Sequence, residues 1–246
     1  MVDTNRQAKR NGKSLRRDDL KSVRQSSLFA KMHAKNFASL MEHASLRTIS
    51  AKTEILSESD PAEFLFVVHD GCIELFAGTN HRETTIALVR PVSTFALAAA
   101  LNDTTYLLSA RTVHQSRLLA IPAHLIRAMF IIDTDFAQSV VTEVATCYRG
   151  AIKSLKNHKL RTGTERLANY VLACSETTGR NGAFRLDLHK RKLASVLGMT
   201  PENLSRAFAT LKSHGVRVEG QDIAIDDIAL LRELAQPTPM IDDWKH

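Results

Sequence analysis

Between residues 188 and 218 the sequence alternates helix-forming and helix-breaking signals in an order that few local structures satisfy. Two sets of apolar residues recur at helical spacing on either side of Gly198, which interrupts the pattern. Thr200 can cap the second helix, Pro201 suits its first position, and Gly215 follows its end. The apolar sets are Leu193, Val196 and Leu197, then Leu204, Phe208 and Leu211. The stretch therefore predicts two short helices joined by a tight turn.

The second of these helices carries a polar edge at its start. Pro201, Glu202, Ser205 and Arg206 share the face opposite the apolar set. Arg can bond two guanine acceptors, Glu can accept from the cytosine amine, and Ser can contact a base or a phosphate. Basic residues flank both helices and can neutralise phosphates: Lys190, Arg191, Lys192, Lys212 and Arg217. We expect DNA contacts from two groups of residues. At the start of the helix they are Thr200, Pro201, Glu202, Ser205 and Arg206, and in the basic flanks they are Lys190, Lys192 and Lys212. The alternative is a helical hairpin with a solvated charged face.

The segment GMTPENLSRAFATL, with the hairpin-like stretch VRVEGQDIAI after it, resembles the DNA-binding domain of the bacterial CRP/FNR regulators. In the FNR branch, a Glu, a Ser and an Arg spaced E-x-x-S-R contact a TTGAT-type half-site, and Glu202, Ser205 and Arg206 occupy those places. The resemblance covers residues 28 to 227 in the order and nature of the elements. It implies a homodimeric transcription activator whose partners are double-stranded DNA and RNA polymerase.

A formal charge of +7 and a pI near 9.5 favour an anionic partner. The first 24 residues hold eight Lys and Arg against three Asp, with almost no apolar residues. We therefore expect residues 1–25 to be a disordered basic tail, which either adds nonspecific DNA affinity or only solvates the chain. No stretch has the apolar length of a membrane span or of a signal peptide, so we expect a cytoplasmic protein without a membrane partner.

Cys72, Cys147 and Cys174 are widely and irregularly spaced, which favours reduced, buried thiols over disulfides or a zinc site. The FNR prototype carries a cysteine cluster near its N-terminus for an iron–sulfur cluster, whereas this sequence has no Cys before residue 72. An iron–sulfur sensor of that design is therefore not expected.

From Leu46 to Ile121, short apolar runs alternate with turn-forming residues, which indicates an antiparallel β-sandwich or barrel. The piece LFVVHDGCIELF resembles the hairpin of the cyclic-nucleotide-binding β-roll, with Gly71 in its turn. A cupin-like metal enzyme is the alternative, but His69, His81 and His114 stand singly, with no H-x-H pair. Because the sequence also contains no nucleophile–base or paired-carboxylate constellation, we do not expect an enzyme.

Members of this family that bind cyclic AMP have a phosphate-binding cassette, with a Gly-Glu pair and, eleven residues after that Gly, an Arg before Ser-Ala. Anchoring the comparison on Ser109 and Ala110 places the Arg position at Leu108 and the Gly-Glu pair at Leu97 and Ala98. A buried phosphate without its cation would cost several kcal/mol. We therefore expect that neither cyclic AMP nor cyclic GMP binds.

The apolar stretch STFALAAALNDTTYLL replaces the cassette. It predicts either a filled core or an apolar pocket for a flat cofactor such as haem. The segment FALAAALNDTTYLLSAR resembles the nitric-oxide-responsive branch of the family, some members of which sense through haem. His33, His69, His81 and His114 are the candidate ligands, and none of them is favoured over a surface or hydrogen-bonded role.

The longest helical pattern runs from Asp133 to Lys159. Its apolar residues recur in steps that form a stripe along the helix: Phe136, Val140, Val144, Ala151 and Leu155. The stripe predicts a dimer seam, or else a helix that packs only on its own β-roll. Gly163 ends this helix, and Thr162 with Glu165 predicts a capping box for the next one, at the expected hinge between domains.

Together these patterns predict an α+β chain with an N-terminal antiparallel β-roll, a long dimerisation helix and a C-terminal winged helix-turn-helix. The expected domains are a basic tail (1–25), an effector-sensing β-roll (26–132), a dimerisation helix (133–160), a DNA-binding domain (161–236) and a loose tail (237–246). The effector and the target genes leave no signature in the sequence.

Overall fold

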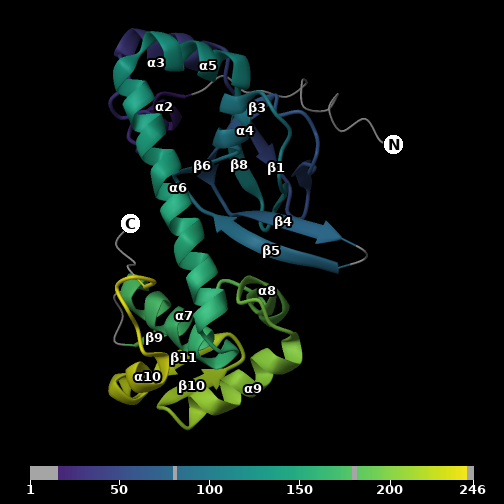
Figure 1. The fold of residues 1–246 in the computed structure, drawn as a ribbon, viewed down its shortest axis with the longest axis vertical. Helices are drawn as coiled ribbons and strands as arrows, with labels where there is room; N and C mark the ends of the chain where they lie inside the picture. The colour runs from purple at the N-terminus through teal and green to yellow at the C-terminus, as the bar shows by residue number, and fades with distance from the viewer. Residues whose placement is uncertain (1–15, 80–81, 179–181, 243–246) are drawn as a thin grey trace. The chain divides into compact units, whose positions relative to one another are not determined.

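The computed structural model describes residues 16–79, 82–178 and 182–242 and divides into two compact units, residues 1–146 and 147–246. Among the described residues, no helix is both long and apolar enough to cross a bilayer. The N-terminal unit contains, in chain order, α2 (Arg17–Arg24), α3 (Ala34–Glu42), β1 (Ser45–Ile49), β2 (Glu54–Leu56), β3 (Phe64–Asp70), β4 (Ile73–Thr79), β5 (Arg82–Val89), β6 (Ser93–Phe95), α4 (Leu97–Asn102), β7 (Ser109–Thr112), β8 (Ser116–Pro122), α5 (Ala123–Ile132) and the first part of α6 (Thr134–Leu160) (Figure 1).

Two four-stranded antiparallel sheets form the β-roll of this unit. One sheet has the strand order β1-β8-β3-β6 and the other has the order β2-β7-β4-β5. The strands arise from the short apolar runs between residues 46 and 121, which turn-forming residues separate. The predicted antiparallel β-roll is confirmed.

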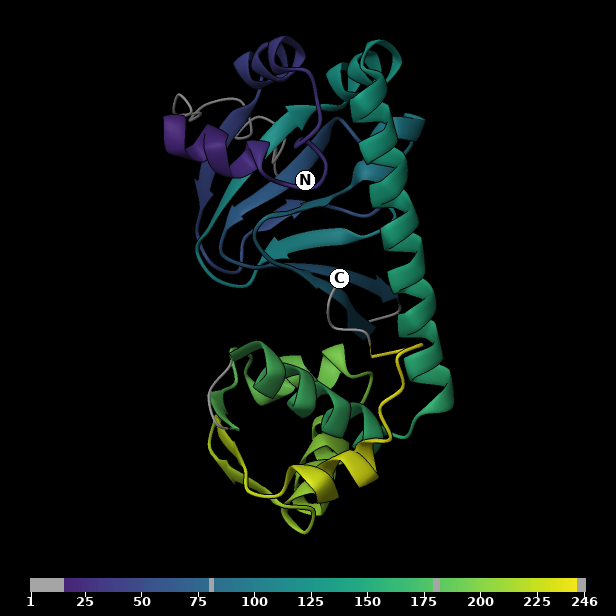
Figure 2. The ribbon, with the colours of Figure 1, turned by 90° about the vertical axis from the view of Figure 1, so that its left-hand side faces the viewer.

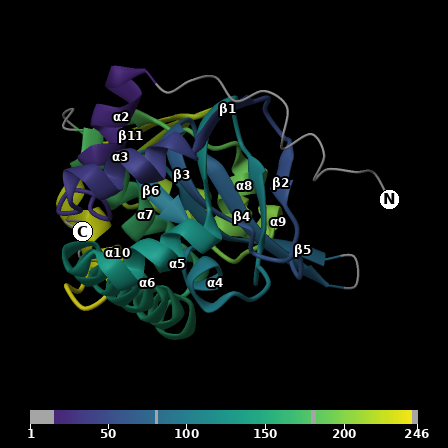
Figure 3. The ribbon, with the colours of Figure 1, turned by 90° about the horizontal axis from the view of Figure 1, so that it is seen from above.

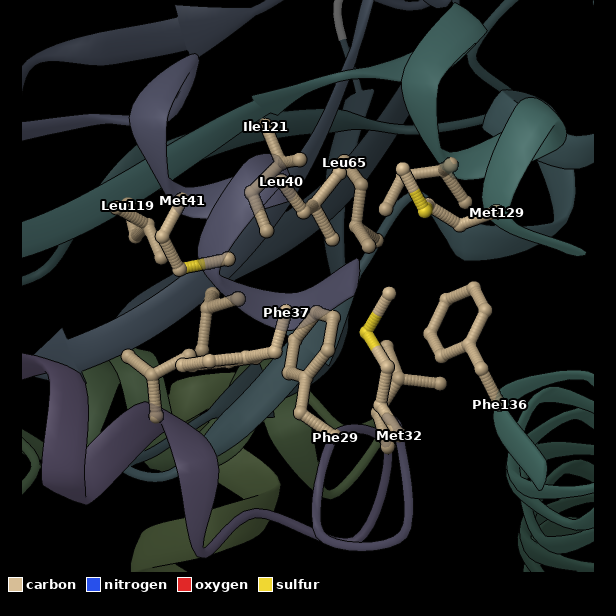
Figure 4. Close-up of a cluster of buried hydrophobic side chains, with 14 of the residues drawn as sticks. Phe29, Met32, Phe37, Leu40, Met41, Leu65, Leu119, Ile121, Met129 and Phe136 are labelled. Atoms are coloured by element: carbon tan, nitrogen blue, oxygen red, sulfur yellow. The ribbon is translucent and has the colours of Figure 1, made fainter. Parts of the chain in front are cut away.

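The first of these sheets is covered on both faces, because successive side chains of a strand point in opposite directions. Leu65 of β3 belongs to a core that α2, α3, α5 and α6 complete, whereas its neighbour Phe66 belongs to a core shared with the second sheet. Figure 3 shows α3 and α5 side by side over the sheet. Figure 4 shows the helix-covered core, where Phe29 stacks on Phe136 with ring centroids 5.8 Å apart.

Helix α2 corrects the prediction of a disordered tail over residues 1–25. Residues 17–24 are helical and Val23 lies in the helix-covered core. Figure 2 shows the helix, in purple, against the strands of this unit. The remainder of the predicted tail, residues 1–15, lies outside the described residues.

A buried carboxylate holds α2 on the sheet. Asp19 is only 5 % exposed, and it accepts hydrogen bonds from Arg117 Nη2 at 2.9 Å and from the backbone N–H of Arg16 at 3.2 Å. His69 Nε2 lies 3.0 Å from the same carboxylate. Burial alone would raise the pKa of Asp19, but these bonds and charges outweigh burial and hold its pKa below the ordinary value. Partner charges on the sheet therefore stabilise a helix that has few apolar residues of its own.

The turn between β3 and β4 requires glycine, as the sequence predicts. Gly71 has a φ of +93°, which residues with a Cβ rarely adopt. A Cβ at this position would lie 2.3 Å from Ser116 Oγ. Ser116 is fully buried, and its hydroxyl accepts a hydrogen bond from Cys72 N at 3.2 Å, so it has little room to move away.

We expect Gly71→Ala to lower the free energy of unfolding by about 1–3 kcal/mol, because the backbone is strained and the new methyl group meets Ser116. Gly150→Ala is the matched control, since a Cβ there has no heavy atom within 4 Å. That change should raise helix stability by about 1 kcal/mol. Urea denaturation of both variants measures the difference, and a Gly71→Ala variant as stable as the wild type would contradict the turn geometry.

Asp133 caps the start of α6 and ties this helix to the N-terminal segment. Its buried carboxylate accepts hydrogen bonds from Phe136 N at 3.0 Å, from His33 N at 2.9 Å and from Asn36 Nδ2 at 2.9 Å. Burial alone would raise the pKa of Asp133, but the three hydrogen bonds outweigh it and hold this pKa below the ordinary value.

Asp133→Ala should cost about 3 kcal/mol of unfolding free energy, because buried donors lose their acceptor. Since the folded pKa of Asp133 lies below the unfolded value of about 3.9, its stabilisation is present above that pH and is lost as the pH falls through the folded pKa. The difference in unfolding free energy between wild type and variant should therefore be largest near neutral pH and shrink below about pH 4. Denaturation curves across this range test it, and a difference that does not change with pH would contradict the assignment.

The C-terminal unit contains the rest of α6 and a three-stranded antiparallel sheet with the strand order β10-β11-β9. Its elements after α6 are α7 (Gly163–Thr178), β9 (Ala183–Arg185), α8 (Lys190–Val196), α9 (Pro201–Lys212), β10 (Val216–Glu219), β11 (Asp222–Ile225) and α10 (Ile228–Ala235). Buried side chains from these elements form its core: Leu167, Val171, Leu193, Leu204, Phe208, Leu211, Ile223 and Leu231. The predicted winged helix-turn-helix is confirmed.

The capping box predicted at the start of α7 is present. The backbone N–H of Thr162 donates to Glu165 Oε2 at 2.6 Å, and the backbone N–H of Glu165 donates to Thr162 Oγ1 at 3.3 Å. These two bonds let α7 begin at Gly163, so this glycine starts α7 and does not end α6, which stops at Leu160.

The prediction of a loose tail over residues 237–246 is wrong for its first part. Asp242 is 8 % exposed and accepts hydrogen bonds from Arg161 Nη1 at 2.7 Å and from Thr238 N at 2.8 Å. Because a buried carboxylate requires a partner, the pair with Arg161 fixes this segment at the end of α6. Residues 243–246 lie outside the described residues.

Candidate DNA interface

The helix-turn-helix is built from local signals that the sequence carries. Thr200 Oγ1 accepts a hydrogen bond from Asn203 N at 3.2 Å, and Pro201 occupies the first position of α9. Gly198, in the turn, has a φ of +62°, and a Cβ there would lie 2.8 Å from His158 Cδ2. The turn therefore needs glycine both for its backbone conformation and for its close approach to α6.

A guanidinium from α7 holds the turn in place. Arg166 Nε donates to Leu197 O at 2.8 Å, Nη2 donates to Gly198 O at 3.3 Å, and Nη1 donates to Arg161 O at 2.6 Å. Burial lowers the pKa of Arg166, and its direct partners are carbonyl oxygens. Those carbonyls belong to the ends of α6 and α8, where helix dipoles favour a cation. No pattern in the sequence indicates this role of Arg166, because contacts with carbonyl oxygens follow no residue pattern.

The side chains expected to contact bases lie together at the exposed start of α9. Pro201, Glu202, Ser205 and Arg206 are all exposed, and Thr200 precedes them as the cap. Ser205 Oγ donates to Pro201 O at 3.1 Å. Hydrogen bonds from its own backbone and from Thr200, and the charge of Arg206, hold the pKa of Glu202 below its ordinary value. The surface thus presents a carboxylate, a hydroxyl and a guanidinium.

Basic side chains surround this surface to different degrees. Lys190 and Lys212 are exposed, whereas Lys192 is half-buried. Lys190 Nζ lies 5.6 Å from the ring centroid of Phe208, which links α8 to α9. Arg217 differs from the lysines, because its Nη2 donates to Asp226 Oδ1 at 2.8 Å and its charge is therefore already paired.

In the β-roll, none of the cassette positions carries a charge. Leu97 is buried in the helix-covered core, Ala98 is exposed and Leu108 is half-buried. Between the two sheets, Phe66 and Phe95 stack with ring centroids 5.0 Å apart. Further side chains fill the same space: Leu56, Ala62, Val68, Ile73, Val89, Tyr106, Ala110, Leu118 and Ala120.

The candidate haem ligands lie at separate places. His33 donates its backbone N–H to the carboxylate that caps α6, and His69 Nε2 faces the buried carboxylate of α2. His114 is exposed, and His81 lies outside the described residues. Among the residues that the structure describes, no group of three or more His, Cys, Asp and Glu side chains is arranged to hold a metal ion.

Two family models match the chain, one in each unit. The model of the cyclic nucleotide-binding domain matches residues 46–133, and the model of the Crp-like helix-turn-helix domain matches residues 165–234. The chain belongs to the CRP/FNR superfamily of transcription regulators. In this CRP/FNR regulator, the helix-turn-helix assigns DNA binding to the C-terminal unit, and both domains indicate a regulator rather than an enzyme.

Solved structures share the fold of this CRP/FNR regulator. A candidate cAMP-binding regulatory protein from Silicibacter pomeroyi DSS-3 is 27 % identical, with a TM-score of 0.59 over 90 % of this chain and 100 % of that chain. FixK2 from Bradyrhizobium japonicum is 21 % identical, with a TM-score of 0.69 over 79 % of this chain and 98 % of that one. DNR from Pseudomonas aeruginosa is 22 % identical, with a TM-score of 0.50 over 90 % and 100 %. The last two likenesses show the fold alone. No curated protein matches the chain.

Arg206→Ala should weaken binding to the DNA site by about 1–3 kcal/mol and relax the preference at one base pair, because a guanidinium can bond two guanine acceptors. Lys212→Ala is the comparison variant, and it should weaken binding to all sequences alike. Fluorescence anisotropy with the site duplex, and with duplexes changed at single base pairs, measures both effects. An equal loss on every duplex would make Arg206 a phosphate contact.

Proposed function

We propose that this chain is a homodimeric regulator that binds a TTGAT-like palindrome, contacts RNA polymerase as an activator, and responds to an effector other than cyclic AMP. The observation that carries the proposal is the exposed start of α9, where Glu202, Ser205 and Arg206 keep the E-x-x-S-R spacing. A carboxylate, a hydroxyl and a guanidinium in that order suit the base edges of the major groove.

The free face of α6 supports the homodimer. Phe136 and Val140, the first two residues of the predicted stripe, are buried against the β-roll rather than free for a dimer seam. Farther along α6, a set of apolar side chains is open to solvent. The exposed set is Val141 (61 %), Val144 (39 %), Tyr148 (67 %), Ile152 (39 %) and Leu155 (53 %). Its steps of three and four residues are typical of a helix that pairs with a second copy of itself. A palindromic DNA site has the same two-fold symmetry.

Val144→Glu should convert the dimer to monomers, because each copy would bury a carboxylate in the apolar seam. Thr146→Glu is the matched control, since Thr146 is exposed on the same helix and lies outside the apolar set. Sedimentation velocity at micromolar concentration separates the two species. A dimer that persists in Val144→Glu would reject this seam.

The β-roll favours an effector without a phosphate group, because a buried phosphate would need a cation beside it. The cassette positions Leu97, Ala98 and Leu108 offer neither the arginine nor the carboxylate that a cyclic nucleotide needs. The resemblance of residues 95–111 favours a response to nitric oxide or another gas through haem. The described residues fit haem poorly, because Phe66 and Phe95 stack inside the roll and His69 Nε2 already faces a carboxylate.

The packed β-roll favours a second candidate function, a constitutive DNA-binding regulator with a filled, ligand-free roll. In that case the amount of protein in the cell, rather than a ligand, would set the occupancy of its DNA sites. The apolar side chains between the two sheets support this candidate.

One experiment separates these candidates. The chain is purified without oxygen from haem-supplemented cells, and its absorption spectrum and duplex binding are recorded before and after nitric oxide is added. A Soret band that shifts together with DNA affinity supports a gas sensor, whereas a colourless protein with unchanged affinity supports the filled roll. Calorimetry with cyclic AMP should show no binding, and tight binding would reject the proposed effector class.

A further inference from the structure

We propose that Asn203 positions the guanidinium of Arg206 for base recognition, an inference that rests on the proposed function. Arg206 Nη2 donates a hydrogen bond of 2.7 Å to Asn203 Oδ1, and both side chains are exposed at the start of α9. The backbone of Asn203 is part of the helix cap, because its N–H donates to Thr200 Oγ1 at 3.2 Å. The cap therefore fixes the backbone position from which the Asn203 amide reaches the guanidinium.

The direction of this bond suits base recognition. Asn203 precedes Arg206 by three residues, so the two side chains are neighbours on the helix surface. The bond draws the guanidinium toward the N-terminal end of α9, which is the end of a recognition helix that contacts base edges. A guanidinium has five N–H donors, and one bond to Asn203 leaves enough of them to pair with guanine O6 and N7.

Arg206 needs such a partner more than the other two base-contacting residues do. The hydroxyl of Ser205 is held by Pro201 O, and the carboxylate of Glu202 lies on a short side chain. The longer Arg206 side chain borders a hollow of about 410 Å³ between the starts of α7 and α9, which Asn203 also lines. Without Asn203, the guanidinium could occupy this hollow in several conformers, and DNA would have to order it again on binding.

The test measures specificity rather than affinity alone. Fluorescence anisotropy compares the full chain on a TTGAT–ATCAA duplex and on a duplex whose TTGAT guanines are replaced by adenine. The specificity ratio is the dissociation constant for the changed duplex divided by that for the TTGAT–ATCAA duplex. This ratio is determined for wild type, Asn203→Ala, Asn203→Asp, Arg206→Ala and the double variant Asn203→Ala with Arg206→Ala. Thermal melting checks that each variant is folded.

Asn203→Ala should lower the ratio by about 3- to 10-fold per half-site, which corresponds to one hydrogen bond. Asn203→Asp keeps an acceptor oxygen and should retain the ratio even if total affinity falls through repulsion from phosphates. In the Arg206→Ala background, the Asn203→Ala change should leave the ratio unaltered. Thr210→Ala is the matched control, because Thr210 lines the same hollow but its hydroxyl donates to the backbone carbonyl of Arg206 and not to the guanidinium.

Two results would overturn the role of Asn203: an Asn203→Ala variant that keeps the wild-type ratio, or a loss that persists without Arg206. Either result leaves the proposed function intact if the wild type still prefers the TTGAT duplex. A wild type with no such preference would instead reject the proposed function, and this inference with it.

Discussion

The contact between Arg166 and three backbone carbonyls determines where the recognition surface lies within the C-terminal unit. One guanidinium on α7 joins the end of α6, through Arg161 O, to the turn before α9, through Leu197 O and Gly198 O. A lysine could not replace it, since a single ammonium lacks the planar, fixed donors that reach separate carbonyls. Any rotation of α7 against the end of α6 would therefore also move the start of α9.

In the N-terminal unit, the comparable constraint is a sheet whose two faces are both buried. Leu65 and Phe66 are neighbours in β3, yet they lie in different cores, so the helices and the second sheet are both packed against one layer. The helix-covered core also contains Phe136 at the start of α6. A change inside the roll would therefore reach α6 through packed side chains.

Sequence reasoning succeeded where the signals are local. The helix-turn-helix and the capping box of Thr162 and Glu165 depend on residues only a few positions apart. It failed for α2 and for residues 238–242, because Asp19 is stabilised by a residue 98 positions away and Asp242 by one 81 positions away. Neither pairing leaves a periodic trace in the sequence. Asn203 is a different case, since its three-residue spacing from Arg206 was visible in the sequence, but its role required the hydrogen bond.

We expect two copies of the chain to present their α9 helices to a palindrome. One duplex carries TTGAT and ATCAA half-sites whose centres lie about one helical turn apart, and a second duplex has five base pairs inserted between them. The most direct measurement compares the affinity of the chain for the two duplexes. Because the insertion rotates one half-site to the opposite side of the duplex, we expect the affinity to fall to the level of a single half-site. Equal affinity for both duplexes would contradict a dimer with fixed recognition helices.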